Sequence, residues 1–162
     1  MKVEGLDQTI KTLRQLDKES LKSMRKDFKT VAKPLVDNAR AKQPGTYPLS
    51  RMENSVMDKN RGFKYEPKKT RSGIIARAST KAYRRAHAIC RVTQRDPAGA
   101  MVDMAGKTTD SVFARNLTAK LGKPSRFMWP AADQSLPSVT YAAQQVIDKW
   151  VAHANQLLAR QA

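Results

Sequence analysis

Helical periodicity at both ends of the chain is the feature that most limits what this sequence can fold into. Near the N-terminus, apolar side chains recur every three or four residues, which predicts a helix over 6–33. This helix is either continuous or divided in two by the polar residues 17–20. Pro34 lacks a backbone N–H and its ring clashes with the preceding turn, so we expect a kink or break there. Pro44 and Gly45 then stop the helix.

A second helix is predicted at the C-terminal end. Pro137 and Ser138 are typical of a helix start, and the helical pattern continues to about Arg160. One face of this helix is apolar, as expected for a helix that packs on a core. That face carries Ala143, Ile147, Trp150, Ala154, Leu157 and Leu158.

The residues between the two helices change period. Short β-branched runs at 72–79 and 86–93 indicate strands, and 100–104 is a third candidate strand. The remainder, 43–71 and 105–125, is expected to form extended loops or arms rich in basic residues. A short helix is possible within the second of them, over 111–121, with Gly122 as its stop.

This order of elements predicts the fold class. The expectation is α+β, with a long N-terminal helix and a C-terminal helix packed on a small antiparallel sheet, and with long basic loops. A length of 162 residues favours one domain, 1–162. The apolar runs are too short to cross a bilayer, so no membrane partner is expected. The lone Cys90 excludes an internal disulfide framework, and a buried thiol within a strand is favoured over a reactive one.

The charge of the chain indicates a negatively charged partner. Lysine and arginine number 31 against 14 acidic residues, a formal net charge of +17. A chain that repels itself this strongly is typical of proteins that contact nucleic acid, an anionic membrane or an acidic protein surface. On the helix over 6–33 the basic residues are expected to form an ordinary solvated face.

The charge surplus is greatest over 58–95, where twelve basic residues face only Asp58 and Glu66. Two interleaved tyrosines do not make a base-stacking platform, so contact with a phosphate backbone or an acidic partner is favoured over base reading. A plain solvated basic surface remains the alternative. The candidate contacts with a phosphate backbone or with an acidic partner are Lys64, Lys68, Lys69, Arg71, Arg84 and Arg85.

The sequence predicts no enzymatic activity. His87 and His153 have no cysteine or acidic residue at ligand spacing, so no metal site is expected, and no cofactor is expected because the glycines are scattered. Asp96, Asp103 and Asp110 recur every seven residues, which is a weak pattern for a metal-dependent nuclease.

Three stretches together resemble a known family. They are "GLDQTIKTLRQL" after Val3 and Glu4, "KTVAKPLVDNARAKQP" over 29–44, and "KPSRFMWPAADQSLPSV" over 123–139. In this order they are similar to the neck and tail-completion proteins of long-tailed bacteriophages, including the lambda-type minor tail component. That family typically has Arg-Phe-Leu-x-Pro-Ala before its last helix, and this chain has Arg126, Phe127, Met128, Pro130 and Ala131 there. The chain departs from the family at 102–106, where many members have an aromatic and acidic strand with a Gly-Thr turn.

The resemblance implies a structural virion protein that completes the tail and joins it to the head. It implies a homo-oligomeric ring, expected to be hexameric, in the neck or at the top of the tail, after assembly in the host cytoplasm. Its partners would be connector, tail-terminator or tail-tube proteins, and basic loops facing the channel would touch packaged DNA without sequence preference. The alternative is a standalone basic protein that binds nucleic acid without sequence specificity.

The candidate subunit contacts follow from the same resemblance. The segment 62–69 is expected to be an exposed hairpin arm or a mobile loop, and the segment 107–122 a second contact loop or a mobile one. Burial of aromatic surface before the last helix is expected to fix its entry, so this region is favoured as a structural anchor over a binding site. The residues assigned to a subunit contact or structural anchor are Arg126, Phe127, Trp129 and Pro130.

Overall fold

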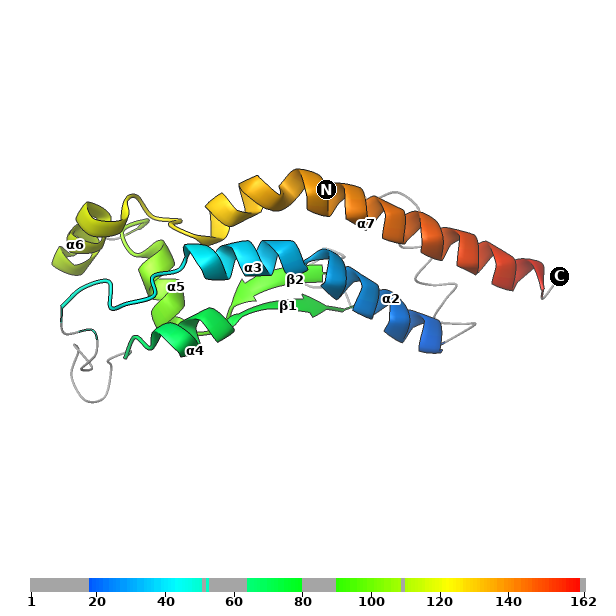
Figure 1. Cartoon of the computed structure of the whole chain (residues 1–162), viewed down its shortest axis with the longest axis horizontal. Coiled ribbons are helices and arrows are strands. Elements are labelled where there is room, and N and C mark those ends of the chain that lie inside the picture. The colour runs from blue at the N-terminus through cyan, green and yellow to red at the C-terminus, as the bar shows by residue number, and fades with distance from the viewer. Residues whose placement is uncertain (1–17, 51, 53–63, 80–89, 109, 161–162) are drawn as a thin grey trace. The chain divides into compact units, whose positions relative to one another are not determined.

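The computed structural model describes residues 18–50, 52, 64–79, 90–108 and 110–160. The described chain is mostly helical with a small two-stranded antiparallel sheet, so the predicted α+β class is confirmed (Figure 1). The predictions over 6–17, 53–63 and 80–89, which include Arg84 and Arg85, lie outside the described residues. The elements are α2 (Lys18–Val31), α3 (Lys33–Lys42), α4 (Pro67–Ser72), β1 (Ile74–Ala78), β2 (Cys90–Gln94), α5 (Pro97–Met104), α6 (Val112–Leu121) and α7 (Met128–Ala159).

The chain divides into two compact units, and α7, β1 and β2 each contribute residues to both. The described residues of unit 1 are 18–33, 76–79, 90–91 and 137–160. Those of unit 2 are 34–50, 52, 64–75, 92–108 and 110–136. A single domain over 1–162 stays a prediction.

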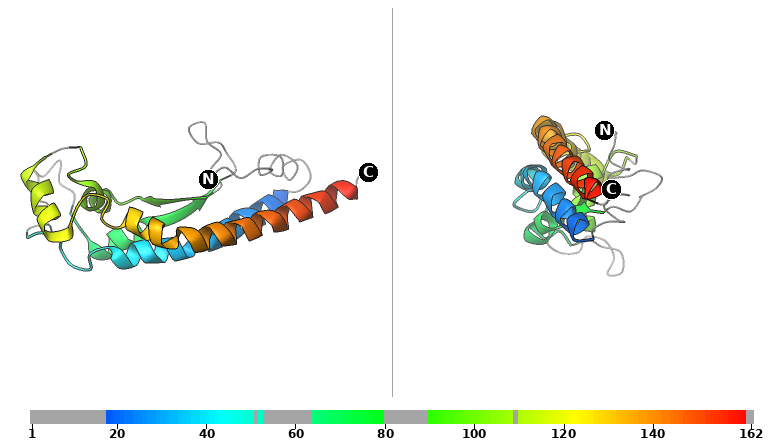
Figure 2. Two further views of the ribbon diagram at one scale, coloured as in Figure 1. Left: turned by 90° about the horizontal axis from the view of Figure 1, so that it is seen from above. Right: turned by 90° about the vertical axis from the view of Figure 1, so that its right-hand side faces the viewer.

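The core of unit 1 lies between α2 and the C-terminal part of α7, which run side by side in both views (Figures 1 and 2). Helix α2 places Leu21, Met24 and Phe28 on one face, since they are three and four residues apart. They pack with Ile147, Trp150 and Ala154 of α7 in one buried cluster. The predicted apolar face of α7 is therefore correct over these three residues.

Partly buried side chains surround this cluster. Ala143 and Leu157 of α7 pack against it, as predicted, and so does Cys90, as expected of an inward-facing thiol. The sequence also predicts Leu158 on this face, but 47% of its surface is exposed. It follows Leu157 directly, and adjacent helical residues point about 100° apart, so both cannot face the core equally.

Polar contacts fix the register of α2 against α7 in unit 1. The Asp27 carboxylate accepts hydrogen bonds from Trp150 Nε1 at 3.0 Å and from Lys149 Nζ at 2.9 Å. Ser20 Oγ lies 3.0 Å from His153 Nε2, and the His153 ring meets Trp150 edge-on at 5.3 Å. These pairs satisfy polar groups beside the apolar cluster, where an unpaired group would be costly.

Proline governs the ends of the N-terminal helices as predicted, but not the start of α7. Helix α2 ends at Val31 and α3 begins at Lys33, so the break falls just before Pro34, and α3 ends at Lys42 ahead of Pro44. In contrast, α7 begins at Met128 and Pro137 lies inside it, so the predicted start at Pro137 is wrong. Contacts in unit 2 stabilise the extra turns, because Ala131 is buried and Asn38 Nδ2 donates to Ser135 Oγ at 2.7 Å.

The third predicted strand, 100–104, is also wrong, because these residues form the end of α5. Asp96 caps this helix by accepting from Gly99 N at 3.0 Å, and Pro97 occupies its first turn. The same carboxylate lies 3.0 Å from Thr70 Oγ1, which ties α5 to α4. A Cβ atom at Gly99 would lie 2.3 Å from Thr70 Cγ2, so only glycine fits this close approach.

The two long loops contain helices. The short helix predicted over 111–121 is confirmed as α6, which Ser111 caps and Gly122 ends at a φ of 85°. The segment 105–125 is therefore not an extended arm. The expected hairpin arm over 62–69 is wrong for its described part, because residues 67–69 begin α4 and Tyr65 is fully buried. The Tyr65 hydroxyl donates to the Pro44 carbonyl at 3.0 Å.

We expect Met24→Ala to lower the free energy of unfolding by about 2–5 kcal/mol, because it removes a fully buried side chain between two helices. Chemical denaturation followed by circular dichroism measures this loss. Lys26→Ala, an exposed change on the same helix, is the matched control and should stay within about 0.5 kcal/mol of wild type. Equal losses in the two variants would contradict the assigned core.

We expect the Tyr65 phenol to lose its proton at a higher pH than an exposed tyrosine does. Burial raises the pKa of its phenol to about 12, with a further upward contribution from Asp96 and an opposing one from Arg71. A raised folded-state pKa means that Tyr65 contributes stability below about pH 10, which is lost as the pH rises toward about 12. The phenolate absorbance of wild type minus that of Tyr65→Phe should therefore have its midpoint near pH 12. A midpoint near pH 10 in the folded chain would rule out a buried Tyr65.

Candidate interaction surfaces

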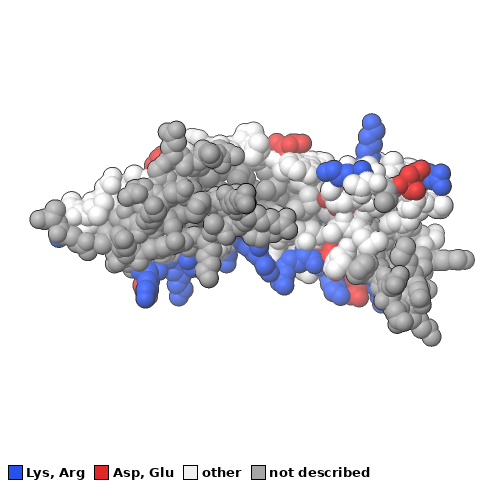
Figure 3. All heavy atoms as spheres, turned by 180° about the vertical axis from the view of Figure 1, so that it is seen from behind, with Lys and Arg blue, Asp and Glu red and all other residues white. Residues whose placement is uncertain are grey.

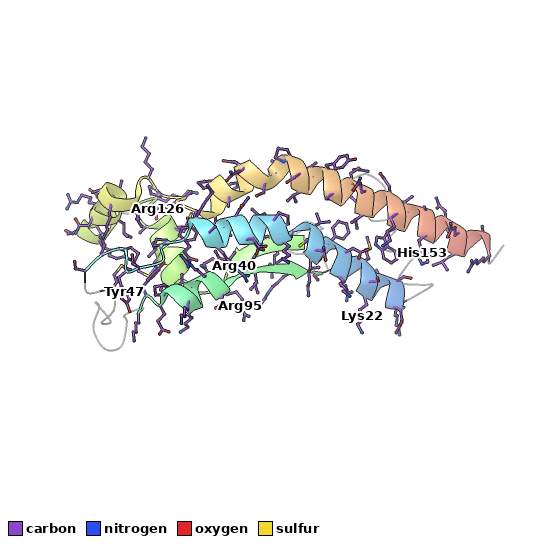
Figure 4. The ribbon with its side chains drawn as sticks, viewed as in Figure 1. Lys22, Arg40, Tyr47, Arg95, Arg126 and His153 are labelled. Carbon is purple, nitrogen blue, oxygen red and sulfur yellow. The ribbon has the colours of Figure 1, made fainter. Side chains whose placement is uncertain are left out.

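The outer side of α2 forms an open basic groove of about 600 Å³ in unit 1, which we call the α2 groove. Lys22 projects from the side of α2 that faces away from α7 (Figure 4). Lysine and arginine side chains stand out along the lower left edge in the space-filling view, where α2 lies (Figure 3). The groove is lined by Glu19, Lys22, Ser23, Arg25, Lys26, Lys29 and Ala78.

The helical repeat explains why the basic residues gather on one side. The core residues of α2 occupy one face, and Lys22, Lys26 and Lys29 are spaced four and three residues apart on another. All three lysines are exposed. Of the two acidic residues on α2, Asp27 is bound to Trp150 and Lys149 at the α7 side, so Glu19 alone lines the groove. The groove therefore keeps a strong positive charge.

Lys29 also acts on the nearby thiol of unit 1. Burial raises the pKa of Cys90, and the positive charge of Lys29 opposes that rise. The net direction is upward, so the thiol stays protonated at neutral pH. The sequence-based expectation of an inert thiol over a reactive one agrees with this direction.

Unit 2 carries the described members of the six candidate contacts predicted from the sequence. Lys64, Lys68 and Lys69 are exposed, and the last two lie on α4. Arg71 is exposed as a residue, but its Nη2 donates to the Gln43 carbonyl at 3.2 Å. Arg40 in turn donates to the Arg71 and Ile74 carbonyls at 3.2 and 2.8 Å. Arg71 thus helps to hold α3 and α4 in place, while the three lysines face solvent.

Arg126 fastens the segment before α7 to the rest of unit 2. Its side chain lies near the start of α7 (Figure 4). Burial lowers the pKa of the guanidinium, and the negative charge of Asp103 opposes that shift. The guanidinium donates to the carbonyls of Gly122, Val102, Asp103 and Ala105 at 3.0, 2.8, 3.2 and 3.1 Å, and to Thr118 Oγ1 at 3.1 Å. We call this set of contacts the Arg126 clamp.

The Asp103 carboxylate adds further hydrogen bonds to the segment that Arg126 holds. Its Oδ1 accepts from Phe127 N at 2.8 Å and from Met128 N at 3.4 Å, which satisfies amides at the start of α7. Phe127 is buried, with 1% of its surface exposed. Arg126 and Phe127 are therefore structural anchors within unit 2.

Trp129 and Pro130 differ from the two residues before them, because both are exposed. Trp129 exposes 59% of its surface, although tryptophan is the largest apolar side chain. Leu136, seven residues later on the same face of α7, exposes 60%. Of the four predicted contact or anchor residues, Trp129 and Pro130 are the exposed ones, so the expected burial of Trp129 is wrong.

The evenly spaced carboxylates serve separate structural roles. Asp96 caps α5, Asp103 belongs to the clamp, and Asp110 lies 3.7 Å from Arg115 in an exposed ion pair. Across the described ranges, no three His, Cys, Asp or Glu side chains are grouped so that they could hold a metal ion. No described helix combines the length and apolar character needed to cross a bilayer.

Comparison of the chain with protein-family models, with curated proteins and with solved structures found no match.

Sequence reasoning missed the α2 groove and the role of Arg126. The groove was readable in part, because Lys22, Lys26 and Lys29 follow the same three-and-four spacing as the core residues. The clamp was not predictable from the sequence, because most of its carbonyl acceptors lie 21 to 24 residues before Arg126 and backbone carbonyls carry no side-chain signature.

Arg126→Ala should lower the stability of the chain by at least about 2 kcal/mol, because several carbonyls lose a charged donor together. Arg115→Ala is the matched control, since its ion pair is exposed and should contribute less than about 0.5 kcal/mol. Chemical denaturation of both variants measures the difference. A clamp variant as stable as the Arg115 variant would show that these contacts do not hold the segment.

Proposed function

We propose that this protein is a non-enzymatic structural component of a tailed bacteriophage. In this proposal it forms a ring, expected to be hexameric, in the neck or at the top of the tail. The ring completes the tail and joins it to the head through connector, tail-terminator or tail-tube partners. The resemblance of three ordered stretches to the tail-completion family supports this role, and the third stretch contains Arg126, the donor of the clamp.

The observation that carries the proposal is the exposed Trp129 beside the clamp. Arg126 and Phe127 fix the backbone immediately before it, so the tryptophan is presented from a rigid segment. Rigid presentation favours binding, because less conformational freedom is lost when the partner docks. Tryptophan is also the residue type most enriched among interface hot spots. A scaffold that displays a preorganised tryptophan suits subunit assembly better than chemistry on a small molecule.

A second function is favoured by a separate observation, the α2 groove. A standalone protein that binds nucleic acid without sequence specificity would need only such a positively charged surface. The two functions differ in what each requires of the chain. The standalone function requires tight nucleic-acid binding by the chain alone, whereas the virion role requires incorporation into particles.

The virion role predicts that particles made without this chain contain separate heads and tails in electron micrographs. Supplying the wild-type chain should join them, and supplying Trp129→Ala should not. A lost tryptophan hot spot costs about 2 kcal/mol or more, or roughly a thirtyfold weaker contact. Normal virions without the chain would refute the role.

Val112→Ala is the matched control for this experiment, because Val112 is also exposed in unit 2, at 64%. It should restore joined particles. The free energy of unfolding of the Trp129→Ala chain should lie within about 0.5 kcal/mol of the wild-type value, since the substitution changes an exposed side chain. Joined particles with Trp129→Ala at wild-type yield would contradict Trp129 as the contact.

A further inference from the structure

We propose that the α2 groove binds the phosphate backbone of duplex DNA. The groove presents Lys22, Lys26 and Lys29 as three exposed ammonium groups, with Arg25 between them. None of the six candidate contacts predicted from the sequence is among the described lining of the groove, and the structure therefore adds a second positive surface.

The spacing of the lysines suits a phosphate chain. A helix rises about 1.5 Å per residue, so Lys22 and Lys29 are displaced by about 10 Å along α2. One strand of B-DNA carries a phosphate every 3.4 Å or so along its axis, so about three phosphates fall within that length. Each lysine can therefore contact a different phosphate. The flexible lysine side chains compensate for the remaining difference between the lysine spacing and the phosphate spacing.

The lining of the groove favours nucleic acid over an acidic protein. Lysine is depleted at protein–protein interfaces, which instead concentrate aromatic residues in a desolvated centre. The groove contains no aromatic and no large apolar residue among its described lining, since Ala78 is its largest apolar member. The described lining therefore offers a protein partner no apolar contact site, whereas a phosphate backbone needs only the positive charge.

The same lining favours a duplex over a single strand. Proteins that bind single strands stack the bases on aromatic side chains, and the described lining offers none. A duplex keeps its bases stacked and presents only phosphates and sugars along its edge. Contacts from lysine ammonium groups to phosphates carry no sequence information, so binding should be independent of sequence.

Because Asp27 faces α7, it does not reduce the positive electrostatic potential of the groove. If Asp27 faced the lysines, it would neutralise one of them, but its carboxylate is bound to Trp150 Nε1 and Lys149 Nζ. Glu19 is the acidic residue of the described lining and lies at the N-terminal end of the groove, where it would repel a phosphate. We therefore place the DNA phosphates along the stretch from Lys22 to Lys29. The choice of DNA over other duplexes rests on the proposed virion function, since packaged DNA passes through the neck.

The test uses the full chain and a short DNA duplex of mixed sequence, with affinity measured by fluorescence anisotropy across salt concentrations. The triple variant Lys22→Gln, Lys26→Gln and Lys29→Gln removes the groove's ammonium groups. The control variant Lys107→Gln, Lys120→Gln and Lys123→Gln removes the same charge from exposed lysines of unit 2. Circular dichroism checks that both variants keep the wild-type fold.

The groove variant should bind the duplex about tenfold or more weakly near 0.1 M salt. Its slope of log affinity against log salt should be shallower by about 3, because three phosphate contacts are lost at about 0.9 each. The control should keep both values close to wild type. Equal losses in the two variants would show that total charge matters and not the groove, and would overturn the proposal.

A second probe, poly-glutamate, separates DNA from an acidic protein partner. If the groove variant loses poly-glutamate binding but keeps DNA binding, the groove is an acidic-protein site and the proposal fails. No DNA binding by the wild-type chain at about 50 mM salt would also overturn it. Neither result touches the particle experiment with Trp129, so failure of the groove and failure of the virion role are distinguishable.

Discussion

The division of α2 into two faces is the constraint on which unit 1 depends. One face supplies Leu21, Met24 and Phe28 to the core, and the opposite side carries the lysines of the groove. Both faces repeat every three or four residues, so one helix can satisfy both without compromise. Asp27 lies at the boundary and binds α7, and the basic side therefore remains basic. The same helix thus stabilises the fold and concentrates the charge.

Unit 2 is stabilised by the partly buried guanidinium of Arg126, whose charge must be satisfied by hydrogen-bond acceptors. A chain this basic cannot easily bury a further positive charge, because desolvation is costly and few acidic partners are present. Backbone carbonyls take their place as acceptors, and they are available wherever a helix or turn ends. The clamp therefore converts helix ends at α5 and α6 into a support for the start of α7. The exposed Trp129 follows from this, since its neighbours already fill the interior.

The parts of the fold that sequence reasoning predicted correctly are those set by local chemistry. Pro34 marks the break between α2 and α3, Gly122 ends α6, and the α2 and α7 stripes form the core of unit 1. One error arises where distant contacts decide, and the other where a local signal outweighs the β-like composition. Residues 128–136 join α7 because unit 2 packs against them, although Pro137 suggested a later start. Residues 100–104 form a helix because Asp96 and Pro97 start one upstream, a capping signal that was readable in the sequence.

The central claim is that this chain is a structural subunit whose basic surfaces and exposed tryptophan meet other molecules in an assembled particle. A cryo-electron microscopy reconstruction of the head–tail junction tests it most directly. The account predicts a ring of this chain in which Trp129 is buried against a neighbouring subunit and the α2 groove faces DNA. A reconstruction in which Trp129 and Lys22, Lys26 and Lys29 all face open solvent would contradict it.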